Sequence, residues 1–308
     1  MSKDLATGVV VTCLAVAVCT VVPIAGLMGS AFIPVPLVFF RAKLGRQAAT
    51  VIALAALGCA VLMGGRLDVL FFGELLLIGF VMGELMARQW PLEKTVAAVC
   101  VAVVIAGLGG LLVSSLETGQ GLLTPLSEGV RYHLELSLQL YQQMGLSQDQ
   151  LHFLESSMEG IQQVLVGMMP ALVIGSTLMV TWISLLAARR VCQRCGLPFP
   201  DYGALDRWKA PELMVWGVIG SGVLLLLPAL AAKMVGLNGL AVFMVIYFFQ
   251  GMAVVAFFFQ KKQIPRFARM VLYGLIVVQQ LVMLAVIGVG FFDTWFNFRK
   301  LGKPLAPS

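Results

Sequence analysis

Nine runs of apolar residues, joined by short polar or charged connections, constrain the fold of this 308-residue chain more than any other feature. A helix needs about 20 mostly apolar residues to cross a bilayer. Hydrophobic residues make up 60% of the chain and charged residues only 12%, whereas soluble domains have about 45–50% and about 25%. We therefore exclude a soluble globular protein and predict an all-α, polytopic transmembrane helical bundle with eight or nine spans. The candidate spans are residues 5–22, 24–40, 48–63, 69–86, 95–112, 161–188, 213–232, 240–259 and 270–292.

Prolines interrupt several of these runs. Pro23 separates the first two runs, and Pro34 and Pro36 stand inside the second, which we expect to bend because each proline removes a backbone hydrogen bond. Irregular backbone at membrane depth must face protein or a water-filled cavity. Pro170 and Pro228 predict kinks in the sixth and seventh runs.

The positions of Lys and Arg predict a cytoplasmic N-terminus. The first run follows only one lysine, Lys3, and no small-x-small cleavage site follows it, so we expect a retained span and not a signal peptide. With the N-terminus inside, 15 of the 21 Lys and Arg residues lie in inner segments, as expected for a bacterial inner-membrane protein. The net charge of +6 then needs no nucleic-acid partner.

The side of the C-terminal tail stays open at this point. Nine complete crossings would put Arg299, Lys300 and Lys303 outside, against the positive-inside rule. Either the second or the last run does not cross fully, or the tail is an exception.

We predict one integrated membrane domain in three parts: a five-span bundle over 1–114, an extracytoplasmic amphipathic insertion over 115–160, and a second bundle over 161–308. Thr124-Pro125 predicts the start of one helix in the insertion. Ser147 and Gln150 form a capping box that begins a second one. These two helices either pack on the bundle and rest in the headgroup layer or cover an outward-facing pocket as a lid.

Two acidic residues, Glu74 and Glu84, lie in the fourth run. A charge at mid-bilayer costs about 2.5–3.5 kcal/mol, so intramembrane acids usually face the protein interior or a cavity. Glu84 has Arg88 four residues on, an ordinary helix-surface pair. Glu74 has no partner within reach along its helix and is our candidate substrate or ion contact. Gly79 and Gly83 form a GxxxG motif, which favours close helix packing.

The other deep polar residues are Gln250 and the pair Gln279-Gln280. Each either forms a structural hydrogen bond to a neighbouring helix or contacts a ligand. The hypothetical substrate-binding set is Glu74, Gln250 and Gln279.

Basic residues of the inner segments are candidates for contact with anionic lipid or a partner protein: Arg189, Arg190, Arg207, Lys261 and Lys262. Cys192 and Cys195 form a CxxC motif, but a structural zinc site needs four ligands, and no other Cys or His lies in that segment. We expect incidental thiols and no metal. No nucleotide-binding or hydrolase motif stands in a suitable setting, so we expect no catalytic residues, no cofactor and no enzyme.

Two short stretches carry a family resemblance. One is DYGALDRWKAP at 201–211, which continues to Val215-Trp216, and the other is FDTWFNFRK at 292–300. Together with the proline-rich second run, they resemble the YybS-like bacterial membrane proteins, a family defined by a domain of unknown function.

The first six runs are also similar to the substrate-binding S-components of energy-coupling-factor transporters. The shared features are the proline-containing first hairpin and the small-residue third run. This resemblance implies a substrate-binding subunit that docks on an ATPase module. The extra spans and the outer insertion depart from that pattern, so no substrate is carried over.

Two functions remain open. The first is a transport-related substrate-binding subunit without its own ATPase and with a pocket near Glu74. The alternative is a membrane scaffold or regulatory partner with no small-molecule substrate. Expected partners are the lipid bilayer and either an ATPase or transmembrane coupling module or another envelope protein, with no nucleic acid.

Overall fold

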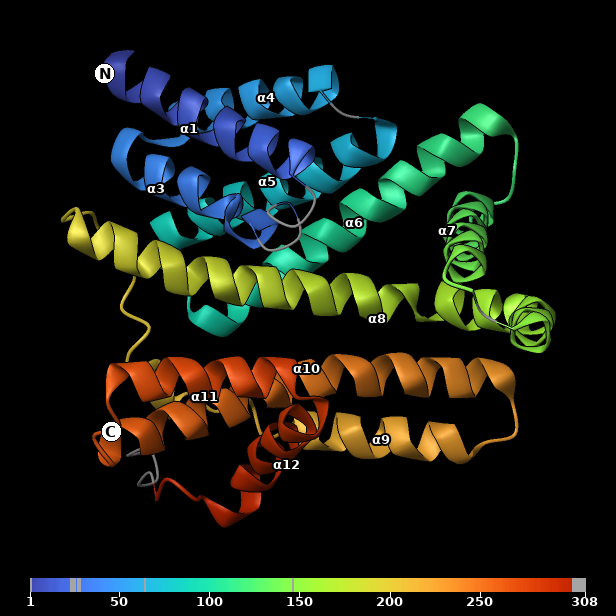
Figure 1. The fold of residues 1–308 in the computed structure, drawn as a ribbon. Coiled ribbons are helices and arrows are strands. Elements are labelled where there is room, and N and C mark those ends of the chain that lie inside the picture. The colour runs from blue at the N-terminus through green and yellow to red at the C-terminus, as the bar shows by residue number, and fades with distance from the viewer. Residues whose placement is uncertain (1, 23–25, 27–28, 64, 146, 301–308) are drawn as a thin grey trace. The chain divides into compact units, whose positions relative to one another are not determined.

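The protein is an all-α membrane-type bundle, as predicted. The computed structural model describes residues 2–22, 26, 29–63, 65–145 and 147–300, and these residues form eleven α-helices, two short 3-10 helices and no strand (Figure 1). Contacts between Cα atoms divide the chain into two compact units, unit 1 over Met1–Asp201 and unit 2 over Tyr202–Ser308. The three-part organisation with boundaries at 114/115 and 160/161 stays a prediction.

Unit 1 is built around helix α5. The helix packs against α3, α4, α6 and α8, and half of its candidate span is buried. The elements of unit 1 are α1 (Ser2–Val21), the 3-10 helix η1 (Ser30–Phe32), α3 (Pro34–Leu44), α4 (Arg46–Met63), α5 (Arg66–Ala87), α6 (Leu92–Thr118), α7 (Thr124–Gln143) and α8 (Gln148–Arg194).

The GxxxG motif makes a close helix contact between α5 and α3. A Cβ atom added at Gly79 would lie 2.7 Å from the carbonyl oxygen of Pro34, and one at Gly83 would lie 3.2 Å from the side chain of Arg41. The prediction of close packing is therefore confirmed, because α3 lies against α5 where the two glycines carry no side chain.

The prolines of the second run begin a helix, and they do not bend one. Pro34 and Pro36 occupy the first turn of α3, where a backbone N–H has no intrahelical partner and proline is well tolerated. The helix that follows has only 11 residues. The earlier part of this predicted span, at 24–25 and 27–28, lies outside the described residues.

Fewer helices than the eight or nine predicted spans are long and apolar enough to cross a bilayer on their own. All nine apolar runs contain helix, but six helices in the described part of the chain are long and apolar enough to cross a bilayer. The count rises to seven if α11 (Arg266–Val278) and α12 (Gln280–Phe296), which are bent relative to one another, together form a single span. Two runs give shorter helices, α3 with 11 residues and α9 (Met214–Leu226) with 13. The first is short because the helix begins only at Pro34, and the second because the helix ends just before Pro228.

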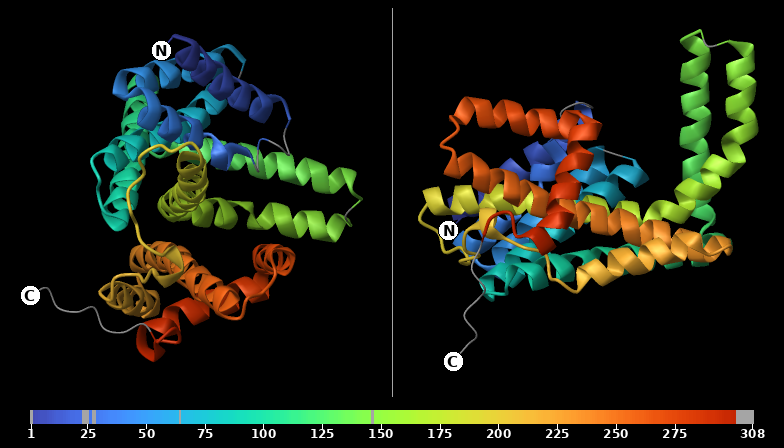
Figure 2. Two further views of the ribbon diagram at one scale, coloured as in Figure 1. Left: turned by 90° about the vertical axis from the view of Figure 1, so that its left-hand side faces the viewer. Right: turned by 90° about the horizontal axis from the view of Figure 1, so that it is seen from below.

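The outer insertion forms a helical hairpin of α7 and the first part of α8. The predicted capping box at Ser147 and Gln150 is present, and the helix that it begins runs for 47 residues without a break into the sixth apolar run. Val130 of α7 and Leu151 of α8 are buried in the hairpin. Figure 2 shows the hairpin pointing away from the other helices of unit 1. The two alternatives for these helices, packing in the headgroup layer or covering a pocket as a lid, stay predictions.

Unit 2 is organised around α10. This helix packs against α9, α12 and the 3-10 helix η2, and α12 crosses it where Gly290 meets the carbonyl of Tyr247 and Gly251 meets that of Val286. Helices α11 and α12 meet at an angle of 99°. Besides α9, the elements are η2 (Leu205–Arg207), α10 (Leu230–Lys261), α11 (Arg266–Val278) and α12 (Gln280–Phe296).

The contact between α3 and α5 predicts a specific stability loss. A leucine at Gly79 would overlap the backbone of Pro34, and overpacking of this kind costs about 1–3 kcal/mol or more. We expect Gly79→Leu to lower the thermal unfolding midpoint in detergent. Gly107→Leu on α6 is the control, because a Cβ atom there meets nothing within 4 Å. Equal midpoints for both variants would contradict this packing.

Candidate functional site

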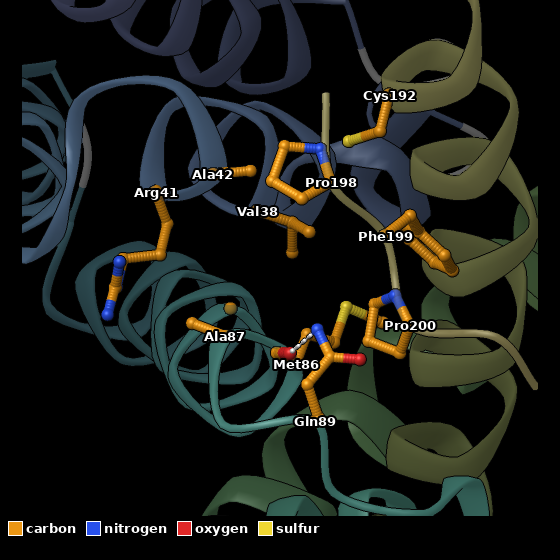
Figure 3. A pocket seen from close by; sticks show the side chains of 11 residues that line it. Val38, Arg41, Ala42, Met86, Ala87, Gln89, Cys192, Pro198, Phe199 and Pro200 are labelled. Atoms are coloured by element: carbon orange, nitrogen blue, oxygen red, sulfur yellow. Dashed lines mark hydrogen bonds between the residues drawn. The ribbon is translucent and has the colours of Figure 1, made fainter. Parts of the chain in front are cut away.

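A small cavity lies at the basic end of unit 1, the end that carries Arg41, Arg46, Arg88 and Arg190. Its volume is about 210 Å³. By the positive-inside rule, we expect this end on the cytoplasmic side. Figure 3 shows Cys192 Sγ pointing toward Pro198 and the guanidinium of Arg41 extending from one edge. The cavity is lined by Val38, Arg41, Ala42, Gly83, Met86, Ala87, Gln89, Cys192, Pro198, Phe199 and Pro200.

Two features of the sequence form this cavity. Gly83 lets the stem of Arg41 lie directly on α5. At the end of α8, Gly196 has a left-handed φ of 65° and Leu197 N–H donates to the carbonyl of Cys192, a Schellman-type end that turns the chain. The Pro-Phe-Pro segment at 198–200 then closes the side of the cavity.

An ion pair stands beside the cavity. Arg41 Nε lies 2.6 Å from Glu84 Oε1, and both side chains are largely buried. Arg46 Nε lies 3.9 Å from the same oxygen. The main partner of Glu84 is therefore Arg41 of α3, and not Arg88 of its own helix as the i+4 spacing suggested.

One buried face of α8 runs from the cavity into the unit. It contains Thr177, Thr181, Ser184, Ala188 and Cys192, each at most 1% exposed. The spacing of four, three, four and four residues keeps them on one side of the helix. Ser184 donates to the carbonyl of Ala31 at 2.7 Å, whereas the hydroxyl of Thr181 has no hydrogen-bond partner among the described residues.

Glu74 stands at the far end of this face. Thr177 Oγ1 lies 3.3 Å from Glu74 Oε1 and 2.7 Å from the carbonyl oxygen of Val173. A hydroxyl has one proton, so the bond to the carboxyl is the weaker of the two. Glu74 is thus placed inside the helix bundle of unit 1 beside α8, and no ion pair to it is found in the described part of the chain.

The remaining polar residues that the sequence analysis singled out lie elsewhere. Cys192 is buried in the cavity wall, but Cys195 is exposed. Of the basic residues proposed to face lipid or a partner, four are exposed and Arg189 is partly buried: Arg189, Arg190, Arg207, Lys261 and Lys262.

Unit 2 contains a buried polar network. Arg299 Nη2 lies 2.7 Å from Asp293 Oδ2, and both side chains are completely buried. Arg299 Nη1 also donates to the carbonyl oxygens of Asp206 and Trp208. The left-handed Asn297, with φ 43°, ends α12 and turns the chain so that Arg299 reaches back to Asp293.

Gln250 belongs to this network. Its Oε1 accepts from the backbone N–H of Ala210 at 3.1 Å, and its Nε2 lies 3.5 Å from Asp293 Oδ2. Both ends of the amide therefore have protein partners. Gln279 is exposed at the bend between α11 and α12. The role of Gln250 and Gln279 as substrate contacts stays a prediction.

The network joins the two stretches that carried the family resemblance. Residues 206–210 of the first stretch bind residues 293–299 of the second through Arg299 and, at 2.9 Å, through Lys209 Nζ and Asn297 Oδ1. Sequence reasoning missed this pairing. The signal that could have found it is the presence of Asp293 and Arg299, two opposite charges, at the end of an apolar run.

This contact bears on the side of the tail. The 206–210 segment precedes α9, and α9 and α10 form an antiparallel pair that returns the chain to the same side. The bent pair α11 and α12 is either one broken span or a re-entrant segment. A re-entrant segment would keep the basic tail on the side from which α11 starts, the side that the positive-inside rule favours for these cations.

Fold and site together define a multi-pass helical membrane protein. The chain belongs to the family described as Predicted membrane protein (DUF2232), whose model matches residues 9–294. No protein of curated function and no solved structure matches the chain at a significant level.

The re-entrant alternative makes a prediction about labelling. In a cysteine-free background, we expect Lys300→Cys and Glu212→Cys to react with an impermeant maleimide in inside-out vesicles only. Thr118→Cys, at the end of α6 that leads to α7, should react in intact cells. Reaction of Lys300→Cys from the outside would mean that α11 and α12 cross the membrane as one span.

Proposed function

We propose that this protein is a transport-related, substrate-binding subunit of the bacterial inner membrane. It is not an enzyme and has no ATPase within this chain. A small solute is held in unit 1 along the buried face of α8, between Glu74 and the cavity at the basic end.

The observation that carries this proposal is the continuity of that face. Cys192 lines the cavity, and Thr177 contacts the carboxyl of Glu74. Thr177 and Cys192 are 15 positions apart, which is about 22 Å of helix, and the buried positions on that side are hydroxyl-bearing or small residues together with Leu185.

Non-helical backbone beside this face also supports the proposal. The 3-10 helix η1 packs against α8, and the carbonyl of Ala31 accepts the hydroxyl of Ser184. Breaks in helices at membrane depth are tolerated where they are buried in protein or line a cavity, and in transporters they surround the substrate site.

Energy for transport would come from a partner. The likeness of the first six runs to S-components, which stays a prediction, implies docking on an ATPase or transmembrane coupling module. The face on α8 is closed to water in the structure, since its residues are at most 1% exposed. Solute movement therefore requires α8 to separate from α3 or α5.

Cysteine accessibility tests the proposed path. In a cysteine-free background, Thr181→Cys and Ser184→Cys are expected to react with a small, water-soluble methanethiosulfonate applied to inside-out vesicles, because the path must hydrate when it opens. Ala56→Cys is the matched control, since Ala56 is fully buried but lies on α4.

The rates decide the outcome. Reaction of Thr181→Cys and Ser184→Cys at least tenfold faster than that of Ala56→Cys supports the path. If all three thiols are equally unreactive with every coupling partner present, the face is a packing surface and the proposal fails.

The alternative, a scaffold or regulatory partner, is favoured by the exposed cations Arg190, Arg207, Lys261 and Lys262. Such residues attract anionic lipid or an acidic protein surface. Purification from native membranes separates the two functions. A stoichiometric ATPase partner supports the transport role, whereas an envelope or signalling protein supports the scaffold.

A further inference from the structure

Three arginines surround one carboxylate at the basic end of unit 1. Arg41 of α3 forms the 2.6 Å ion pair with Glu84, and Arg46 of α4 lies 3.9 Å away. Arg88, just after α5, is also close enough to interact electrostatically with Glu84. This group, which we name the arginine cluster, carries an excess of two positive charges.

Most of the hydrogen-bond donors of the cluster are unused within the described residues. A guanidinium has five N–H donors. Arg41 uses Nε for Glu84, and no protein acceptor is found for its Nη groups. Among the residues that the structure describes, the side chains of Arg46 and Arg88 have no hydrogen-bond partner, and that of Arg46 is 65% exposed.

The next ion pair along α3 does not offset this charge. Lys43 Nζ lies 2.8 Å from Asp4 Oδ1, so this lysine and aspartate neutralise one another. The excess charge of the arginine cluster is therefore left for a group outside the chain.

Short turns hold the arginines together. Gly45, with φ 90°, joins α3 to α4 and brings Arg41 and Arg46 to the same end of the unit. Trp90 follows Arg88 and is partly exposed. Tryptophan beside helix ends is typical of the membrane interface, the depth at which lipid phosphates lie.

We propose that the arginine cluster is a binding site for a phosphate group, with Arg41, Arg46 and Arg88 as its donors. A phosphate monoester or diester supplies one or two negative charges, which match the excess of two. Arginine binds phosphate with paired N–H donors. Basic pockets between transmembrane helices on the cytoplasmic side bind anionic lipid headgroups in this way. The site goes beyond the proposed transport role and does not depend on it.

Thermal unfolding of the full chain in detergent tests the site. The protein is titrated with phosphatidylglycerol, with phosphatidylcholine or with inorganic phosphate. Stabilisation by phosphatidylglycerol alone identifies a lipid headgroup as the source, and equal stabilisation by inorganic phosphate identifies a free oxyanion. Stabilisation by neither overturns the proposal.

Variants locate the effect. Arg46→Gln and Arg88→Gln break no hydrogen bond in the structure, and each should weaken binding about fivefold, the contribution of one cation near a membrane surface. Glu84→Gln should strengthen binding, because it removes the only negative charge of the cluster. Lys94→Gln, an exposed cation on α6, is the control for net charge. The assignment is overturned if Lys94→Gln weakens binding as much as the arginine variants do. It is also overturned if Glu84→Gln weakens binding.

Discussion

The structure depends on one constraint: within a bilayer, a polar group must find its partner inside the protein. Unit 2 meets this constraint largely by pairing, although Asp293 Oδ1 and Arg299 Nε have no hydrogen-bond partner among the described residues. Asp293 and Arg299 are fully buried together, Arg299 also binds two backbone carbonyls, and Gln250 ties them to Ala210. Such a network is poor evidence for stability in itself, because desolvation offsets the attraction. It does fix where the tail and the segment before α9 must lie.

Unit 1 meets the same constraint differently. The charges of Arg41 and Glu84 stay at the basic end, and the interior face of α8 carries hydroxyl groups that are only partly paired. The hydroxyl of Ser184 donates to a carbonyl oxygen at 2.7 Å, and that of Thr177 shares its one proton between two acceptors. The hydroxyl of Thr181 has no hydrogen-bond partner among the described residues. An unpaired buried hydroxyl costs about 1–3 kcal/mol, and the proposed solute path would give the Thr181 hydroxyl a partner.

Local signals in the sequence predicted local structure well. The capping box at Ser147, the glycine pair at Gly79 and Gly83 and the helical character of all nine apolar runs are confirmed, because each depends on residues within a few positions. Partners distant in sequence could not be predicted. Glu84 pairs with Arg41, 43 residues away, and Asp206 is joined to Arg299 across 93 residues. No periodicity contains such pairings, which arise only when helices pack.

The central claim is that Thr181 is kept for the solute path and not for stability, and unfolding of Thr181→Val in lipid nanodiscs tests it most directly. Valine has nearly the same shape and removes a buried hydroxyl that lacks a partner. We expect a higher unfolding midpoint than for the parent protein, whereas Ser184→Ala, which loses the bond to Ala31, should have a lower one. A lower midpoint for Thr181→Val as well would show that this hydroxyl stabilises the fold, and would contradict the account.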